Sequence, residues 1–202
     1  DYLKEMEQLS PEEDAVAEAL AWGVSNIVIR IDRRAGDDFV IKQSRKQLRT
    51  QAEWFSRLER IWRELEVMQE LQNLLPAGVV PRVLFEDRDN YLFAMEAIDK
   101  DHKVWKAELL DGKFDLSIAS RLGRYLGAIH RLSFRNQSFQ ERWGDWEIFD
   151  QLRIDPFYRY IVKAHPEIKD WVNDLITEME GNRICLVLAD FSPKNILISG
   201  DQ

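Results

Sequence analysis

Residues 186–198 read LVLADFSPKNILI. One apolar run leads into Asp190, and a second starts directly after Asn195. The pattern predicts a hairpin over residues 184–198, with the acid and the amide on its loop. Asp and Asn in a turn often have only a structural role, but the apolar runs on both sides favour a chemical one. Phosphoryl transfer needs a carboxylate to accept a hydroxyl proton and an amide oxygen to bind a metal.

Composition limits the class of protein. The chain has 202 residues, of which 45% are hydrophobic and 32% charged, and its net charge is −8. This indicates an ordinary globular protein with one large domain or two small lobes. The negative charge argues against a general nucleic-acid binder and is compatible with a cationic substrate, although solubility alone also explains it. A single cysteine and the lack of a long apolar run predict a cytoplasmic protein without a membrane segment.

Hydrophobic periodicity predicts mainly strands and one long helix in the first half. The Ser-Pro-Glu-Glu sequence at residues 10–13 is typical of a helix start. Gly36 marks a hairpin turn between two β-branched runs. The predicted strands are 26–32, 39–43, 79–85 and 91–95, and the predicted helices are 10–22 and 51–75.

The pattern changes after about residue 98. Helices are predicted over residues 116–132 and 167–180, whereas residues 134–160 are rich in aromatic residues and show no clear period. We therefore expect a sheet with a long helix over residues 1–97 and a mostly helical unit over residues 98–202. The overall class is α+β.

Lys42 lies in the middle of an apolar strand, directly after Phe39-Val40-Ile41. Such a lysine can extend to solvent along the polar face. Alternatively it points into a cleft and pairs with phosphates, a role that needs a carboxylate to hold it. Glu64 on the long helix is the candidate, because kinases use an ion pair between a strand lysine and a helix glutamate.

Two further segments are candidates by position only. The turn from Trp22 to Asn26 contains Gly23, and small residues at such a turn let backbone N–H groups approach phosphate oxygens. A plain turn explains it equally well. Residues 95–97 end a strand where the composition changes, so their backbone groups could bind an adenine edge. The alternative there is an ordinary domain linker.

Taken in order, these segments resemble the aminoglycoside phosphotransferase and choline kinase superfamily. The sequence DFSPKNIL at 190–197 is similar to the family's His-Gly-Asp-four-residues-Asn-apolar loop. The sequence LGRYLGAIH at 122–130 is similar to its leucine-glycine helix ending in histidine, and VPRVL at 80–84 to its strand entry. Leu48-Arg49 and Glu53-Trp54 after the Lys42 strand also resemble methylthioribose kinase.

The resemblance implies a bilobal, protein-kinase-like fold and an ATP-dependent phosphotransferase. Its acceptor would be a hydroxyl of a small molecule of aminoglycoside, sugar or amino-alcohol type. Asp190 would be the catalytic base, and Asn195 would bind Mg²⁺. Lys42 would contact the α- and β-phosphates of ATP, with Glu64 holding it.

The same resemblance assigns the remaining nucleotide contacts. Ser25 and Asn26 would lie under the phosphates. The carbonyl group of Met95 or Glu96 and the amide of Ala97 would bind adenine. Neither a nucleic-acid partner nor a membrane is expected, and the oligomeric state is left open.

Two departures from the family pattern support an alternative function. Leu188-Ala189 stand where the family has His-Gly, and leucine cannot form the hydrogen bonds by which that histidine braces the loop. The chain also ends before the strand on which the family carries a second metal-binding Asp, so we expect a truncated second lobe that is inactive by itself. The alternative is a non-catalytic nucleotide-binding or scaffolding relative.

Overall fold

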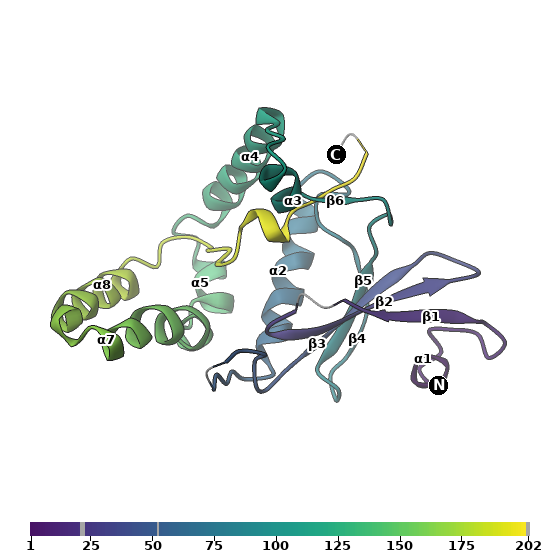
Figure 1. The fold of residues 1–202 in the computed structure, drawn as a ribbon, viewed down its shortest axis with the longest axis horizontal. Helices are drawn as coiled ribbons and strands as arrows, with labels where there is room; N and C mark the ends of the chain where they lie inside the picture. Colours follow the sequence, from purple (N-terminus) through teal and green to yellow (C-terminus); the bar gives the residue numbers. More distant parts are fainter. Residues whose placement is uncertain (21–22, 52, 201–202) are drawn as a thin grey trace.

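The computed structural model describes residues 1–20, 23–51 and 53–200. A five-stranded antiparallel sheet in the order β1-β2-β3-β5-β4 forms its first part (Figure 1). Mostly helical segments follow, which confirms the predicted α+β class. The elements of the first part are α1 Tyr2–Glu5, β1 Ala15–Ala19, β2 Asn26–Arg33, β3 Phe39–Ser44, α2 Arg60–Leu74, β4 Val83–Asp87 and β5 Leu92–Glu96.

The alternation of side chains along β3 decides where Lys42 points. Phe39 and Ile41 are buried in a cluster that the N-terminal segment covers through Leu9. Lys42 pairs with Phe93 of β5, and Phe93 packs against α2. Because neighbouring residues of a strand face opposite sides of the sheet, Lys42 lies on the face that α2 covers.

The helix predicted over residues 10–22 is wrong. Residues 15–19 form β1, which pairs antiparallel with β2 from Ala15 opposite Arg33 to Ala19 opposite Ile29. Pairing with the edge of β2 satisfies the backbone of this alanine-rich segment and overrides its helical preference. Trp22 lies outside the described residues.

The long helix is shorter than its apolar stripe suggested, because α2 begins only at Arg60. The preceding segment folds back on the end of β3. The amide of Leu48 donates to the Trp54 carbonyl at 2.9 Å, and the amide of Ser56 donates to the Lys46 carbonyl at 3.1 Å. These bonds compete with helical ones, so apolar spacing alone misplaces the helix start.

The second part confirms the helices predicted over 116–132 and 167–180, now α4 and α8. The side chain of Asp115 caps α4 by accepting a hydrogen bond from the amide of Ser117 at 2.8 Å. The aperiodic stretch contains short helices and a π-helix, η1. The elements are β6 Lys103–Val104, α3 Trp105–Leu110, α4 Leu116–Ser133, α5 Gln137–Trp143, α6 Glu147–Phe149, η1 Asp150–Arg159, α7 Tyr160–Ala164, η2 Pro166–Ile168, α8 Lys169–Gly181, η3 Pro193–Asn195 and β7 Leu197–Ile198.

The hairpin predicted over residues 184–198 is also wrong. Residues 184–188 form no strand, and β7 pairs instead with β6, Leu197 opposite Val104. The apolar side chains of Leu186 and Leu188 pack against a cluster that contains Leu71 and Ile129. Residues 184–188 are apolar because they pack between helices. A short apolar run of this kind looks the same in the sequence as a buried strand.

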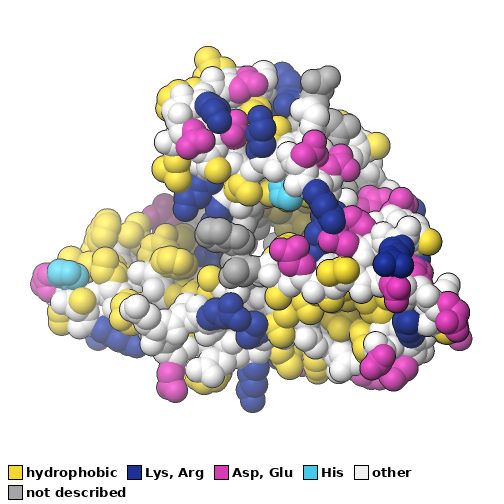
Figure 2. All heavy atoms as spheres, turned by 45° about the vertical axis from the view of Figure 1, so that its right-hand side comes forward, with side chains coloured by type: hydrophobic (Ala, Val, Ile, Leu, Met, Phe, Trp, Pro, Cys, Tyr) yellow, Lys and Arg dark blue, Asp and Glu magenta, His cyan; other side chains and the backbone are white. Residues whose placement is uncertain are grey.

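Charged side chains of both signs are spread over the surface of the sheet part, and exposed apolar ones gather near α7 and α8 at the left of Figure 2. Phe157, Tyr160 and Trp171 belong to the exposed apolar set. Among the described residues, every helix is too short or too polar to cross a membrane.

Candidate active site

Lys42 and Glu64 form an ion pair between β3 and α2. The Lys42 ammonium lies 2.5 Å from Oε1 of Glu64, and the two side chains are 24% and 36% exposed. Nδ2 of Asn26 is 3.4 Å from the other carboxylate oxygen of Glu64. The structure thus brings together three of the predicted site residues at the start of β2, the middle of β3 and the first turns of α2.

Arg60 holds the turn at Ser25 and Asn26 to the start of α2. Its guanidinium donates to the Ser25 carbonyl, to the Arg57 carbonyl at 2.7 Å, and to Oδ1 of Asn26 at 3.4 Å. Arg60 is only 6% exposed, and burial lowers the pKa of its guanidinium. Arg60 escapes sequence-based prediction because an arginine at the start of a helix usually faces solvent.

The turn before β2 is tight. A side chain at Gly23 would place its Cβ 2.4 Å from the Asn26 carbonyl oxygen, so no larger residue fits without a shift. Backbone bonds add to this packing, since the amide of Arg45 donates to the Ser25 carbonyl at 3.1 Å and the amide of Arg49 to the Val24 carbonyl at 3.0 Å. The turn is therefore closely held, and Asn26 links it to the Lys42–Glu64 pair.

The strand end at Met95, Glu96 and Ala97 is held by hydrogen bonds. The amide of Glu96 donates to the Arg82 carbonyl at 2.9 Å, and the amide of Ala97 donates to the Asp38 carbonyl at 3.3 Å. The Glu96 carboxylate accepts from the Arg82 guanidinium at 2.8 Å. The Ala97 amide would therefore have to exchange its bond to Asp38 for one to adenine.

Asp190 and Asn195 lie together on the loop before β7. Nδ2 of Asn195 donates to the Asp190 carbonyl at 2.8 Å, and the Asp190 carboxylate pairs with Lys194 at 2.9 Å. Burial raises the pKa of the Asp190 carboxyl, but the hydrogen bond and charge of Lys194 are among the opposing causes that leave it below its ordinary value. Asp190 is therefore ionised at neutral pH, as a proton acceptor must be.

Lys194 is a further residue of this loop that the motif comparison does not identify. Its position four residues after Asp190 is the sequence signal that could have pointed to it. The pair orients the carboxylate and balances its charge.

The described residues offer few ligands for a metal ion. The described residues contain no group of three or more His, Cys, Asp or Glu side chains that could hold a metal ion. Because the amide nitrogen of Asn195 is bound to Asp190, its oxygen is the atom that fits a hard cation such as Mg²⁺. This donor set supplies one ligand, so further oxygen ligands would have to come from phosphates.

Helix α2 links the two groups of site residues. Glu64 lies on its first half, and Leu71 on its second half packs in the same cluster as Leu188, two residues before Asp190. Ile129 of α4 completes the core of this contact. Leu188 thus occupies the family's histidine position as an apolar contact.

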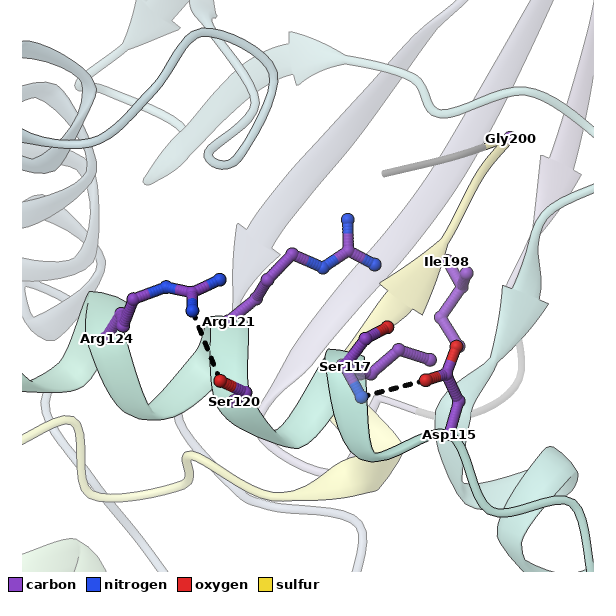
Figure 3. A pocket seen from close by; sticks show the side chains of 8 residues that line it. Asp115, Ser117, Ser120, Arg121, Arg124, Ile198 and Gly200 are labelled. Carbon is purple, nitrogen blue, oxygen red and sulfur yellow. Dashed lines mark hydrogen bonds between the residues drawn. The ribbon is translucent and has the colours of Figure 1, made fainter.

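A cavity of about 500 Å³ lies elsewhere, between α4 and the end of the chain (Figure 3). Asp115, Ser117, Arg121 and Arg124 line it from α4 and its cap, and Ile198 from β7. It contains none of the predicted site residues. The candidate active site is instead formed by the residues around α2 and the loop before β7.

The structure has a five-stranded sheet, a lysine–glutamate pair between that sheet and α2, and an Asp–Asn loop between α8 and β7. Together these features are typical of a kinase-like phosphotransferase fold. A profile described as the phosphotransferase enzyme family matches residues 16–202. The chain therefore belongs to this family, within the aminoglycoside phosphotransferase and choline kinase superfamily. A search of curated proteins found no match.

Proposed function

We propose that the protein transfers the γ-phosphate of ATP to a hydroxyl group of a small molecule. The observation that carries this proposal is the 2.5 Å ion pair between Lys42 and Glu64, which Asn26 joins. A lysine held by a helix carboxylate beside a tight turn is arranged to bind phosphates. We assign this nucleotide-binding role to residues 1–97 and the acceptor side to residues 98–202.

The residues divide the chemistry between them. Asp190 accepts the proton of the acceptor hydroxyl while that oxygen bonds to the γ-phosphorus and the bond to the ADP oxygen breaks. Lys42 binds the α- and β-phosphates, Ser25 lies under them, and the strand end at residues 95–97 binds adenine. Asn195 would hold Mg²⁺ together with the phosphates, and the ion would supply positive charge to neutralise the transferred group.

The acceptor class is an aminoglycoside, a sugar such as methylthioribose, or an amino alcohol. The net charge of −8 is compatible with a cationic acceptor among these. It also opposes nucleic acid as a partner. We place the protein in the cytoplasm, with small-molecule substrates and without a membrane partner.

The test is turnover by the full-length protein. ADP release and the mass of the product are measured with ATP, Mg²⁺ and a panel of aminoglycosides, sugars and amino alcohols. We expect a product heavier by one phosphate with at least one class, and a loss of about 1000-fold or more in Asp190→Asn, because the proton acceptor is removed. Turnover that Asp190→Asn leaves unchanged, or none with the whole panel, would contradict the proposal.

A second candidate is a non-catalytic nucleotide-binding relative. Leu188-Ala189 in place of His-Gly favours it, because a hydrogen-bonding side chain has become an apolar contact. This relative would bind ATP with Mg²⁺ and lose that binding in Lys42→Ala, but would form no product with any acceptor. Calorimetry beside the turnover assay separates the two functions.

A further inference from the structure

The π-helix η1 contacts the segments next to both groups of site residues. Its residue Gln151 binds the segment before α2: the carbonyl of Gln151 accepts from the indole N–H of Trp54 at 2.8 Å, and Oε1 accepts from Ser56 and from the Arg57 amide at 3.0 and 3.1 Å. These contacts fix η1 to the part of the chain that leads into Glu64.

Two residues further on, η1 binds the loop of Asp190. Nε of Arg153 donates to the Ala189 carbonyl at 3.0 Å, and Nη1 donates to the Leu152 carbonyl at 2.7 Å. The next residue, Ile154, is fully buried at 0% exposure. The backbone from which Arg153 extends is therefore held in place, and the second bond limits the freedom of its guanidinium.

Each of three successive carbonyl groups of this loop has a partner. The Leu188 carbonyl accepts from the amide of Phe191 at 3.0 Å, and the Asp190 carbonyl accepts from Asn195 at 2.8 Å. Both donors belong to the loop itself. Arg153 comes from 36 residues away in the sequence, so its bond ties the residue before Asp190 to the rest of the protein.

The sequence around Asp190 explains why such a bond is needed. Leu188 is held by packing, which resists displacement from the cluster but sets no orientation for the peptide that follows. A hydrogen bond has a preferred direction, so the bond that Arg153 donates to the Ala189 carbonyl restricts the orientation of that peptide. π-Helical turns occur frequently at functional sites. Here the turn places Gln151 on the segment that leads into α2 and Arg153 on the residue before Asp190.

We infer that Arg153 is a positioning residue: through its bond to the Ala189 carbonyl it holds Asp190 at the acceptor hydroxyl. The inference rests on the proposed phosphotransferase function. Arg153 acts on the loop of Asp190, whereas the nucleotide phosphates are bound by Lys42. Its loss should therefore slow the transfer step and leave ATP binding nearly unchanged.

The experiment compares Arg153→Gln and Arg153→Lys with a matched control, Arg131→Gln, at an exposed position of α4. In the full-length protein we expect kcat to fall about 100-fold in Arg153→Gln, since small misplacements of a reacting group have effects of this size. The KM for ATP should stay within about twofold. Arg153→Lys, which still donates one hydrogen bond, should recover part of the rate, and Arg131→Gln should match wild type.

Hydrogen exchange of residues 186–195 gives a readout that needs no activity. Arg153→Gln should speed exchange there, and Arg131→Gln should not. An unchanged kcat, unchanged exchange, or a fall in kcat accompanied by an equal weakening of ATP binding overturns the inference. If wild type itself shows no turnover, the proposed function fails and positioning for catalysis with it, while the exchange data still decide whether Arg153 holds the loop.

Discussion

The ammonium group of Lys42 lies 2.5 Å from the carboxylate of Glu64, across the interface of β3 and α2. The two residues are 22 positions apart in the sequence, so local structure alone does not bring them together. Strand alternation turns Lys42 towards α2, and the buried contacts of Ile61 and Leu65 with Phe93 set α2 against the sheet. The pair is the product of this packing.

Removing the pair should weaken nucleotide binding. Lys42→Ala should raise the Kd for ATP about tenfold or more, since a charge-assisted bond to phosphate contributes about 1.5–3 kcal/mol. Glu64→Ala should have a smaller effect, and the double variant should bind no more weakly than Lys42→Ala, because Glu64 acts through Lys42. Titration calorimetry measures all three. Arg34→Ala, which breaks an exposed pair with Asp14, is the control, and an equal loss there would refute a specific role for Lys42.

Arg60 should contribute to stability as well as to the site. Arg60→Met removes the buried bonds to the Ser25 and Arg57 carbonyls, although the Ser25 carbonyl keeps its bond from the Arg45 amide. We therefore expect the free energy of unfolding to fall by about 2 kcal/mol. Urea denaturation measures the change. Arg142→Met, which breaks a more exposed pair with Glu70, should cost less than about 1 kcal/mol. Equal losses of unfolding free energy in the two variants would show that the buried bonds of Arg60 contribute no more to stability than an exposed ion pair.

Restoring the family's histidine should destabilise this protein. Leu188→His places an imidazole in the cluster of Leu71, Leu75 and Ile129, so a loss of about 1–2 kcal/mol is expected from lost apolar contact and buried polar atoms. Leu188→Met keeps the volume and should cost less than about 1 kcal/mol. Thermal unfolding of both variants tests this. A Leu188→His protein that is more stable than wild type would mean that the loop still accommodates a hydrogen-bonding residue.

Acid should weaken the contact between α2 and the helical part. The hydrogen bond and charge of Arg63 lower the pKa of Asp145, while burial opposes them. A carboxyl with a lowered pKa stabilises the fold above its ordinary value of 3.8, and this contribution is lost as the pH falls through the lowered value. The side chain of Asp145 is half exposed, so the contribution at neutral pH is below about 1 kcal/mol.

Denaturation of Asp145→Asn and wild type between about pH 6 and pH 2 measures this contribution. We expect wild type to be the more stable at pH 6 and the difference to shrink towards pH 2. The exposed Asp174→Asn serves as the control for general effects of charge. A difference that stays constant over the whole range would exclude a role for ionised Asp145.

The strands over 26–32 and 39–43 and the helices over 116–132 and 167–180 could be predicted, because each depends on a period of a few residues. The sequence left open whether Lys42 extends to solvent or points into a cleft, and the packing of α2 on the sheet decided it. The true structure of residues 10–22 and 184–198 could not be predicted. An alanine-rich segment becomes β1 only because the edge of β2 is open beside it. An apolar run packs on α2 and α4 instead of pairing because those helices offer a surface there.

The sequence by itself determined which residues are the candidates for the chemistry, since Lys42, Glu64, Asp190 and Asn195 stand in recognisable local patterns. Only the tertiary structure decided what holds them. Three contacts of single side chains hold the candidate site: Arg60 binds the turn at Ser25, Lys194 binds Asp190, and Arg153 binds the Ala189 carbonyl. The bonds of Arg60 and Arg153 to these carbonyls span 35 and 36 residues. Local hydrophobic periodicity in the sequence does not predict such partners, because they meet only after the sheet, α2 and the π-helix have packed.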